Sequence, residues 1–83
     1  MSKLARTSRQ IGTIIQRTRK QRGWTQAQLA ERAGLRQETI SIIESGEKPS
    51  KLPSILAVLA ALDLEFTIGP RAKGTASDIE ELF

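Results

Sequence analysis

The sequence predicts a small all-α domain of four to five helices, followed by one short C-terminal β-strand. Three observations support this prediction. The chain has 83 residues, which suits one domain and is too short for two. Apolar residues recur at helical spacing through most of 8–62, whereas residues 64–68 alternate between apolar and polar. Gly23, Gly34 and Gly46 stand where helices typically end.

A basic, aperiodic arm is expected over residues 1–7, before the first helix. Ser8 is expected to cap this helix, which runs to about Arg22 and ends at Gly23. One face of the helix is expected to be buried, and the residues at helical spacing on it are Ile11, Ile14, Ile15 and Thr18.

The second helix begins with a capping box. Thr25 and Gln28 are three residues apart, so each side chain can bond the backbone N–H of the other residue. Trp24 directly precedes this pair and is expected to pack on Leu29 as a hydrophobic staple. The helix is short, because Gly34 ends it.

Two further helices complete the predicted helical part. The third runs from about Gln37 to Ser45 and ends at Gly46. Ser50 is expected to cap the fourth, and Pro53 is tolerated in its first turn. Apolar residues cover most of the circumference of the fourth helix, which predicts near-complete burial of Leu52, Ile55, Leu56, Val58, Leu59 and Leu62.

The predicted strand at residues 64–68 has no partner strand elsewhere in the helical chain. The simplest partner is a second copy, paired antiparallel across a two-fold axis, so a homodimer is expected. The alternative is an extended linker that lies on the core. The dimerisation residues share one face of the strand and are Leu64, Phe66 and Ile68.

The chain is therefore divided into an arm at 1–7, a helical and dimerisation domain at 8–69 and a flexible acidic tail at 70–83. The end of the tail combines acidic residues with three apolar residues at helical spacing. Such a segment suits a pocket on a partner protein, and simple disorder is the alternative. The candidate partner-binding residues are Ile79, Leu82 and Phe83.

Charge is unevenly distributed along the chain. Residues 1–36 contain nine Lys and Arg and one acidic residue, whereas residues 37–83 contain four basic and eight acidic residues. A basic half favours a polyanionic partner, most often nucleic acid. The alternative is an ordinary solvated helical surface.

The composition excludes several classes of function. The chain contains no Cys and no His, so disulfides, Cys/His zinc sites and catalysis by either residue are excluded. Neither common glycine-rich nucleotide-binding motif occurs. We therefore expect no enzyme activity, no metal and no cofactor. No apolar run is long enough for a membrane span and charges occur throughout the first twenty residues, so a cytoplasmic location without membrane contact is expected.

Two short helices joined by a tight turn form the centre of the chain. Their pattern is Thr25-Gln26-x-x-Leu29-Ala30-x-x-Ala33-Gly34-Leu35-x-x-x-x-Ile40-Ser41-x-Ile43-Glu44-x-Gly46. It resembles the Cro/repressor (Xre-type) helix-turn-helix family over residues 8–62. The resemblance implies a lambda-repressor-like, DNA-binding fold in which Ala30 lets two helices cross closely. It also implies a buried ion pair between Arg19 and Glu44.

Helical geometry indicates which residues of the third helix face DNA. At about 100° per residue, Ile40 and Ile43 fall on the inner side. The side chains on the outer side are short, so this side of the helix can lie close to the bases in a major groove. Glutamine can read adenine, serine reaches several base edges, isoleucine can meet a thymine methyl, and glutamate can accept from cytosine or repel phosphate. The base-reading candidates are Gln37, Glu38, Ser41 and Ile42, with Arg36 as a further candidate for a guanine or a phosphate.

Contacts to phosphates supply most of the affinity of a protein for DNA. The start of the second helix favours an anion through its backbone N–H groups and its dipole. The family resemblance implies that Gln26, at this position, clamps a phosphate. The phosphate-binding candidates are Gln26, Gln28, Thr39, Ser45, Lys48 and Lys51, and Arg6 and Arg9 are candidates for additional contacts.

Within the family, the layout most resembles HipB-like antitoxin repressors. The basis is the Gly-Trp-Thr-Gln sequence at 23–26 and a strand that follows four helices. This resemblance implies a homodimer that binds a palindromic double-stranded DNA operator, represses its own toxin–antitoxin operon and binds a HipA-type Ser/Thr kinase toxin. The alternative is a phage-type or stand-alone Xre-family regulator without a toxin partner.

Overall fold

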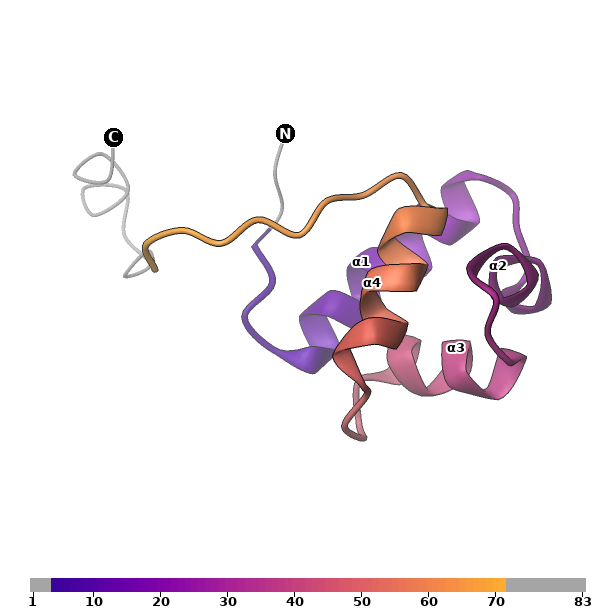
Figure 1. Cartoon of the computed structure of the whole chain (residues 1–83), viewed down its shortest axis with the longest axis horizontal. Helices are drawn as coiled ribbons and strands as arrows, with labels where there is room; N and C mark the ends of the chain where they lie inside the picture. The colour runs from indigo at the N-terminus through magenta and orange to yellow at the C-terminus, as the bar shows by residue number, and fades with distance from the viewer. Residues whose placement is uncertain (1–3, 72–83) are drawn as a thin grey trace.

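The computed structural model of the chain describes residues 4–71, which contain four helices. They are α1 (Ser8–Gln21), α2 (Gln26–Ala33), α3 (Gln37–Ser45) and α4 (Leu52–Ala61). Helix α3 packs against α1 and α2, and α2 also packs against α4 (Figure 1). The prediction of an all-α fold is confirmed, with four helices. The predicted tail contacts at Ile79, Leu82 and Phe83 lie outside the described residues.

The N-cap of α1 is Thr7, and the prediction of Ser8 is wrong. Thr7 Oγ1 accepts a hydrogen bond from the Gln10 N–H at 3.1 Å, and Gln10 Oε1 accepts one from the Thr7 N–H at 3.1 Å. This reciprocal capping box requires Gln or Glu three residues after the cap. Ser8 cannot form it, because Ile11 occupies that position.

The N-cap of α4 also differs from the prediction. It is Lys51, which makes no side-chain capping bond, and Ser50 lies one residue outside the cap. Pro53 is in the first turn as predicted, where its missing N–H needs no partner. At the second helix, the predicted capping box of Thr25 and Gln28 is confirmed.

One fully buried side chain from each helix, together with Leu62, forms the centre of the core. Ile15 of α1, Leu29 of α2, Ile40 of α3 and Val58 of α4 are each 0% exposed. The four helices therefore share one core. Partly buried apolar residues surround it, and they are Ile11, Trp24, Ala33, Leu35, Ile55, Ala61 and Leu64.

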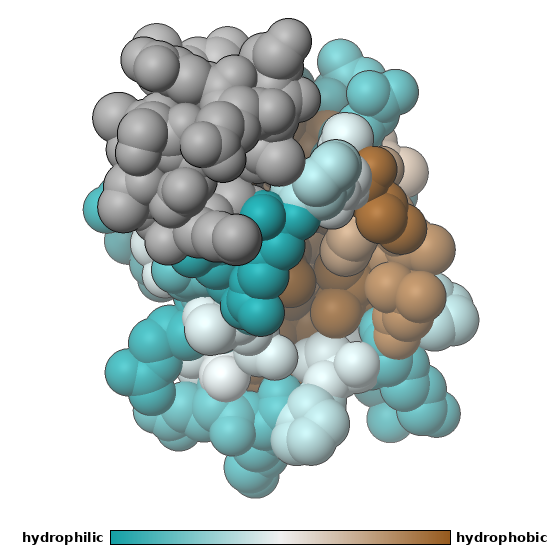
Figure 2. Space-filling view, turned by 90° about the vertical axis from the view of Figure 1, so that its left-hand side faces the viewer, coloured by the Kyte–Doolittle hydropathy of each residue, from teal (hydrophilic) through white to brown (hydrophobic). Residues whose placement is uncertain are grey.

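The predicted near-complete burial of α4 is wrong. Val58 and Leu59 are buried, but Leu52 and Leu56 remain 56% and 44% exposed. Only one side of α4 packs against α2 and α3, so the apolar side chains on the other side remain in water. Figure 2, which faces the left-hand side of Figure 1, shows hydrophobic residues gathered along the right of the view.

The segment at residues 64–70 is extended but forms no strand within the described chain. Leu64 packs against the core, and its N–H donates to Leu59 O at 2.8 Å. Between residues 4 and 71, no backbone–backbone hydrogen bond involves residues 65–70. Phe66 and Ile68 are 49% and 90% exposed, so the linker alternative describes Leu64 but not these two residues. Pairing with a second copy stays a prediction.

Helix α1 crosses the C-terminal end of α3 at very short range. A Cβ atom on Gly12 would overlap the carbonyl oxygens of Ile43 and Glu44. Gly46, which ends α3 with a left-handed φ of 66°, lies against the backbone of Arg9. Both contacts require residues without a side chain, and together they set the separation of the two helices.

We expect Gly12→Ala to lower the free energy of unfolding by about 1–3 kcal/mol, because the added methyl group forces α1 away from α3. The better helix propensity of alanine, about 1 kcal/mol, offsets only part of this loss. Urea denaturation followed by circular dichroism measures the change. Arg17→Ala, at an exposed position of the same helix, is the control and should change stability by no more than about 0.5 kcal/mol. Wild-type stability for Gly12→Ala would mean that the crossing is looser than described.

Candidate nucleic-acid interface

Helix α3 presents a short and mostly polar face to solvent. Ile40 and Ile43 are buried, which confirms the inner side expected from helical geometry. The side chains predicted to read bases are all exposed on the outer side of α3 or directly before it, namely Arg36, Gln37, Glu38, Ser41 and Ile42. The structure therefore brings these five candidates to one end and one side of a single helix.

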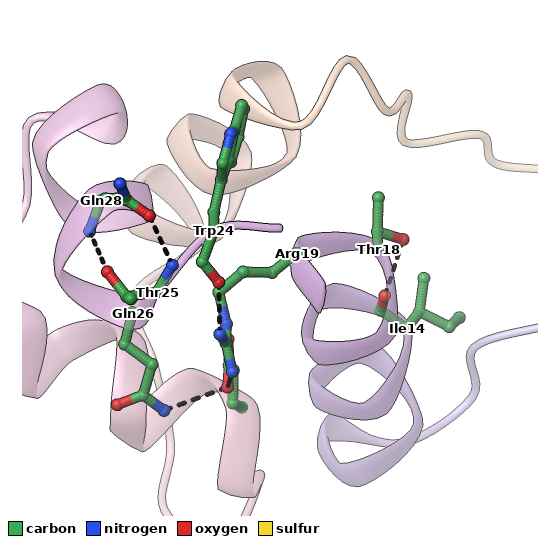
Figure 3. A network of polar contacts seen from close by, with 8 residues as sticks. Ile14, Thr18, Arg19, Trp24, Thr25, Gln26 and Gln28 are labelled. Carbon is green, nitrogen blue, oxygen red and sulfur yellow. Dashed lines mark hydrogen bonds and ion pairs between the residues drawn. The ribbon is translucent and has the colours of Figure 1, made fainter. Parts of the chain in front are cut away.

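A buried ion pair ties this helix to α1. Arg19 Nε lies 2.6 Å from Glu44 Oε2, and Arg19 Nη2 donates to Glu44 Oε1 at 3.1 Å. Arg19 Nη1 also donates to the carbonyl oxygen of Trp24 at 2.7 Å (Figure 3). The two charged residues are only 8% and 7% exposed. The predicted pair is confirmed, and it fixes α3 relative to both α1 and the start of α2.

Gln26 joins the same network, which the sequence did not indicate. Its amide Nε2 donates to Glu44 Oε1 at 3.1 Å, and Figure 3 shows the side chain pointing toward α3. A glutamine amide carries two N–H donors, so one remains for an anion outside the protein. Gln26 also occupies the first position of α2, where helix dipole and free backbone N–H groups favour negative charge.

The other phosphate candidates differ in their surroundings. Gln28 Oε1 accepts from the Thr25 N–H at 2.8 Å, so only its amide N–H groups can reach outward. Ser45 Oγ donates to the carbonyl oxygen of Ile42 at 3.0 Å. Thr39 is half-buried, while Lys48 and Lys51 in the loop between α3 and α4 are exposed. Arg36 is the N-cap of α3 and makes no side-chain capping bond, because a guanidinium has no acceptor for the helix N–H groups.

Several arginines of the basic N-terminal half make contacts within the protein. The guanidinium carbons of Arg32 and Arg22 lie 4.2 Å and 5.6 Å from the ring centroid of Trp24. Arg22 Nη2 also donates to Leu62 O at 2.7 Å, just beyond the end of α4. Figure 3 shows the indole pointing away from Gln26 and α3. These arginines, with the buried Arg19, are therefore not part of the face formed by α3.

Neither a membrane-spanning helix nor a metal-ligand cluster occurs between residues 4 and 71. None of the four helices is both long and apolar enough to cross a bilayer. That part of the chain also contains no group of three or more carboxylate residues placed to hold a metal ion.

A family model described as helix-turn-helix matches residues 15–68 of the chain. The chain belongs to the helix-turn-helix family. In this helix-turn-helix protein, α2 and α3 are the two helices of the motif, and Gly34, with a φ of 71°, stands in the turn between them. The resemblance inferred from residues 8–62 is thus confirmed.

Two similar proteins carry the name antitoxin HipB. The protein from Escherichia coli strain K12 is 34% identical over 59 residues, which are 71% of this chain and 67% of the relative. The protein from Escherichia coli O6:H1 is also 34% identical over 59 residues. The helix-turn-helix chain spans 63% of that relative, slightly less than two thirds of its length.

Solved structures of HipB complexes share the fold. The chain superposes on a HipB variant in an O2 20mer complex with a TM-score of 0.77 and 30% identity, over 84% of this chain and 97% of that one. For a HipA–HipB–O2–O3 complex the TM-score is 0.76 and the identity 29%, over 83% and 97% of the two chains. The arrangement of the four helices is therefore a HipB-like helix-turn-helix fold.

We expect replacement of one partner of the buried ion pair to destabilise this domain more than replacement of both. Arg19→Met leaves the Glu44 carboxylate buried with its main partner missing, which lowers the free energy of unfolding by about 3–5 kcal/mol. The double variant Arg19→Met/Glu44→Leu removes both charges and should recover much of this loss. Urea denaturation of both variants at one protein concentration is the measurement. A double variant less stable than Arg19→Met would contradict this account of the pair.

Proposed function

We propose that this chain is a DNA-binding transcriptional repressor that acts as a homodimer on a palindromic operator, and that it is the HipB-like antitoxin of a toxin–antitoxin operon. The observation that carries the proposal is the exposed face of α3, which consists of short side chains. A buried ion pair to α1 fixes the opposite side of this helix. The protein acts in the cytoplasm, by binding and not by catalysis. The HipB structures with the same fold are complexes with O2 and O4 20mers, which fits operator DNA as the ligand.

The side chains on this face have the chemistry to distinguish base pairs. Gln37 can bond adenine N6 and N7 in the major groove, and Ser41 can reach several base edges. Ile42 is 38% exposed and can contact a thymine methyl group. Glu38 either accepts from cytosine N4 or repels phosphate, and both actions narrow the range of sites that bind.

Phosphate contacts supply affinity without reading sequence. Gln26 offers its second amide N–H at the start of α2, where an anion is favoured. Lys48 and Lys51 follow α3 on an exposed loop and can meet the backbone beside the groove. This division assigns specificity to α3 and affinity to the residues that flank it.

A homodimer places two α3 helices on one duplex. The extended segments at 64–68 of two copies pair antiparallel, which gives partners to the backbone groups that face the other strand and covers exposed Phe66 and Ile68. In such proteins the two recognition helices contact half-sites about 34 Å apart, one turn of DNA. The operator is therefore a palindrome.

Gln37→Ala and Gln26→Ala should change DNA binding in different ways. The first removes a base contact, so its preference for the operator over unrelated DNA should fall about tenfold or more. The second removes a phosphate contact and should weaken binding to all duplexes alike. Gel-shift titration with the promoter upstream of the gene, and with scrambled DNA of the same length, separates the two effects.

Lys20→Ala is the matched control for this experiment. Lys20 is an exposed cation in the last turn of α1, outside both α3 and the start of α2, and its loss should leave both duplexes bound as before. If both glutamine variants bound like the wild type, the assignment of the interface to α3 and the start of α2 would be wrong.

The toxin partner is inferred from the similarity to HipB proteins, since a solved structure with the same fold is a HipA–HipB–O2–O3 complex. A HipA-type Ser/Thr kinase is the expected partner, and the tail residues Ile79, Leu82 and Phe83 are the candidate contacts, outside the described part of the chain. Three apolar side chains on an acidic segment suit a protein pocket better than they suit DNA.

Deletion of residues 72–83 should spare operator binding and weaken capture of a HipA-type kinase encoded beside the gene. Gel shift measures the first property, and co-purification of the co-expressed kinase measures the second. Loss of operator binding in the truncated protein would contradict the role of the tail. If no kinase gene adjoins this one, the chain is a stand-alone regulator, and the toxin part of the proposal is wrong.

A further inference from the structure

An apolar hollow of about 620 Å³ lies where the N-terminal arm meets the extended segment. Its floor includes Ile11 and Ile14 of α1 and Leu59 of α4. One wall is the arm at residues 4–6, and the other is formed by residues 64–67 and 69–71. Figure 1 shows these two stretches on the left of the molecule, whereas α2 and α3 lie on the right. The volume is large enough for several aliphatic side chains.

The apolar side chain of Ile68 is not buried by its own chain. It is 90% exposed, and it is missing from the lining of the hollow although Thr67 and Gly69 both belong to it. Each copy of the protein thus has an open apolar hollow and, at the edge of it, an isoleucine in water. These two features suit a two-fold symmetric interface, in which the isoleucine of each copy can enter the hollow of the other.

The register of the proposed strand pair brings the two features together. If the two-fold axis passes through Phe66, all five residues of the segment are paired, Glu65 faces Thr67, and Ile68 of the partner faces Leu64. A shift of the axis to Glu65 would place two carboxylates directly opposite each other, which is unfavourable. Opposed residues of an antiparallel pair point to the same side of the sheet. The partner's Ile68 therefore lies on the side of Leu64, which lines the hollow.

We propose that the hollow is the seat of Ile68 from a second copy of this chain, and that the N-terminal arm forms its outer wall. This inference rests on the dimer of the proposed function and adds a place for a specific side chain within it. It also gives the arm a role. Leu4, which is 66% exposed, contacts the partner's Ile68, so the arm contributes to dimerisation.

Self-association of three variants tests the proposal. Ile68→Ser and Leu4→Ser each remove an apolar side chain from the seat, and both residues are exposed and outside the helices, so the fold should persist. In sedimentation equilibrium, we expect the dimer dissociation constant to rise about tenfold or more for Ile68→Ser and by a smaller factor for Leu4→Ser. Ile42→Ser, an exposed isoleucine on α3, is the matched control and should dimerise like the wild type.

A second measurement detects the contact directly. In a sample mixed from isotope-labelled and unlabelled full-length chains, an isotope-filtered nuclear Overhauser effect should join the Ile68 methyl groups of one copy to those of Ile14 in the other. Two outcomes would overturn the seat but leave the dimer standing. One is a dimeric wild type without this signal. The other is that Ile68→Ser and Leu4→Ser dimerise as tightly as Ile42→Ser. A wild type that stays monomeric at tens of micromolar would overturn both the seat and the proposed dimer.

Discussion

The ion pair between Arg19 and Glu44 is the constraint on which the position of α3 depends. One guanidinium and one carboxylate connect α1, α3, the carbonyl oxygen of Trp24 and the amide of Gln26 at the start of α2. A buried pair of this kind contributes little net stability compared with apolar residues, but any arrangement that separates its charges is strongly unfavourable. We infer that its main effect is to select one orientation of α3. The small distances at Gly12 and Gly46 limit the same helix sterically, so charge and contact act in the same direction.

The parts of the fold that could be predicted are those decided by neighbours in the sequence. The capping box of Thr25 and Gln28 and the left-handed glycine at position 34 require only a few adjacent residues. The cap of α1 went to Thr7 because two possible caps stand side by side and only one has a glutamine three residues later. The burial of α4 could not be predicted, since the apolar pattern gives the circumference of a helix but not which side its neighbours cover.

The candidate interface follows the same division. The outer face of α3 was predictable because helical geometry places Ile40 and Ile43 inward once the helix is known. The bond from Gln26 to Glu44 was not, since it joins residues from two helices whose relative position the sequence does not specify. The uneven distribution of charge along the sequence did not indicate where the candidate DNA interface lies. Arg19, Arg22 and Arg32 all belong to the basic half, yet each is used within the protein, in the ion pair or around Trp24.

The setting of Trp24 makes the protein its own spectroscopic probe. It is the one tryptophan of the chain, it is half-buried beside the core, and two arginines flank its ring. Indole emission moves to longer wavelength when the ring becomes solvated, so the intrinsic fluorescence of the protein reports on packing at the junction of α1, α2 and α4. Because the ring points away from α3, this signal separates loss of structure from occupation of the α3 face without any added dye.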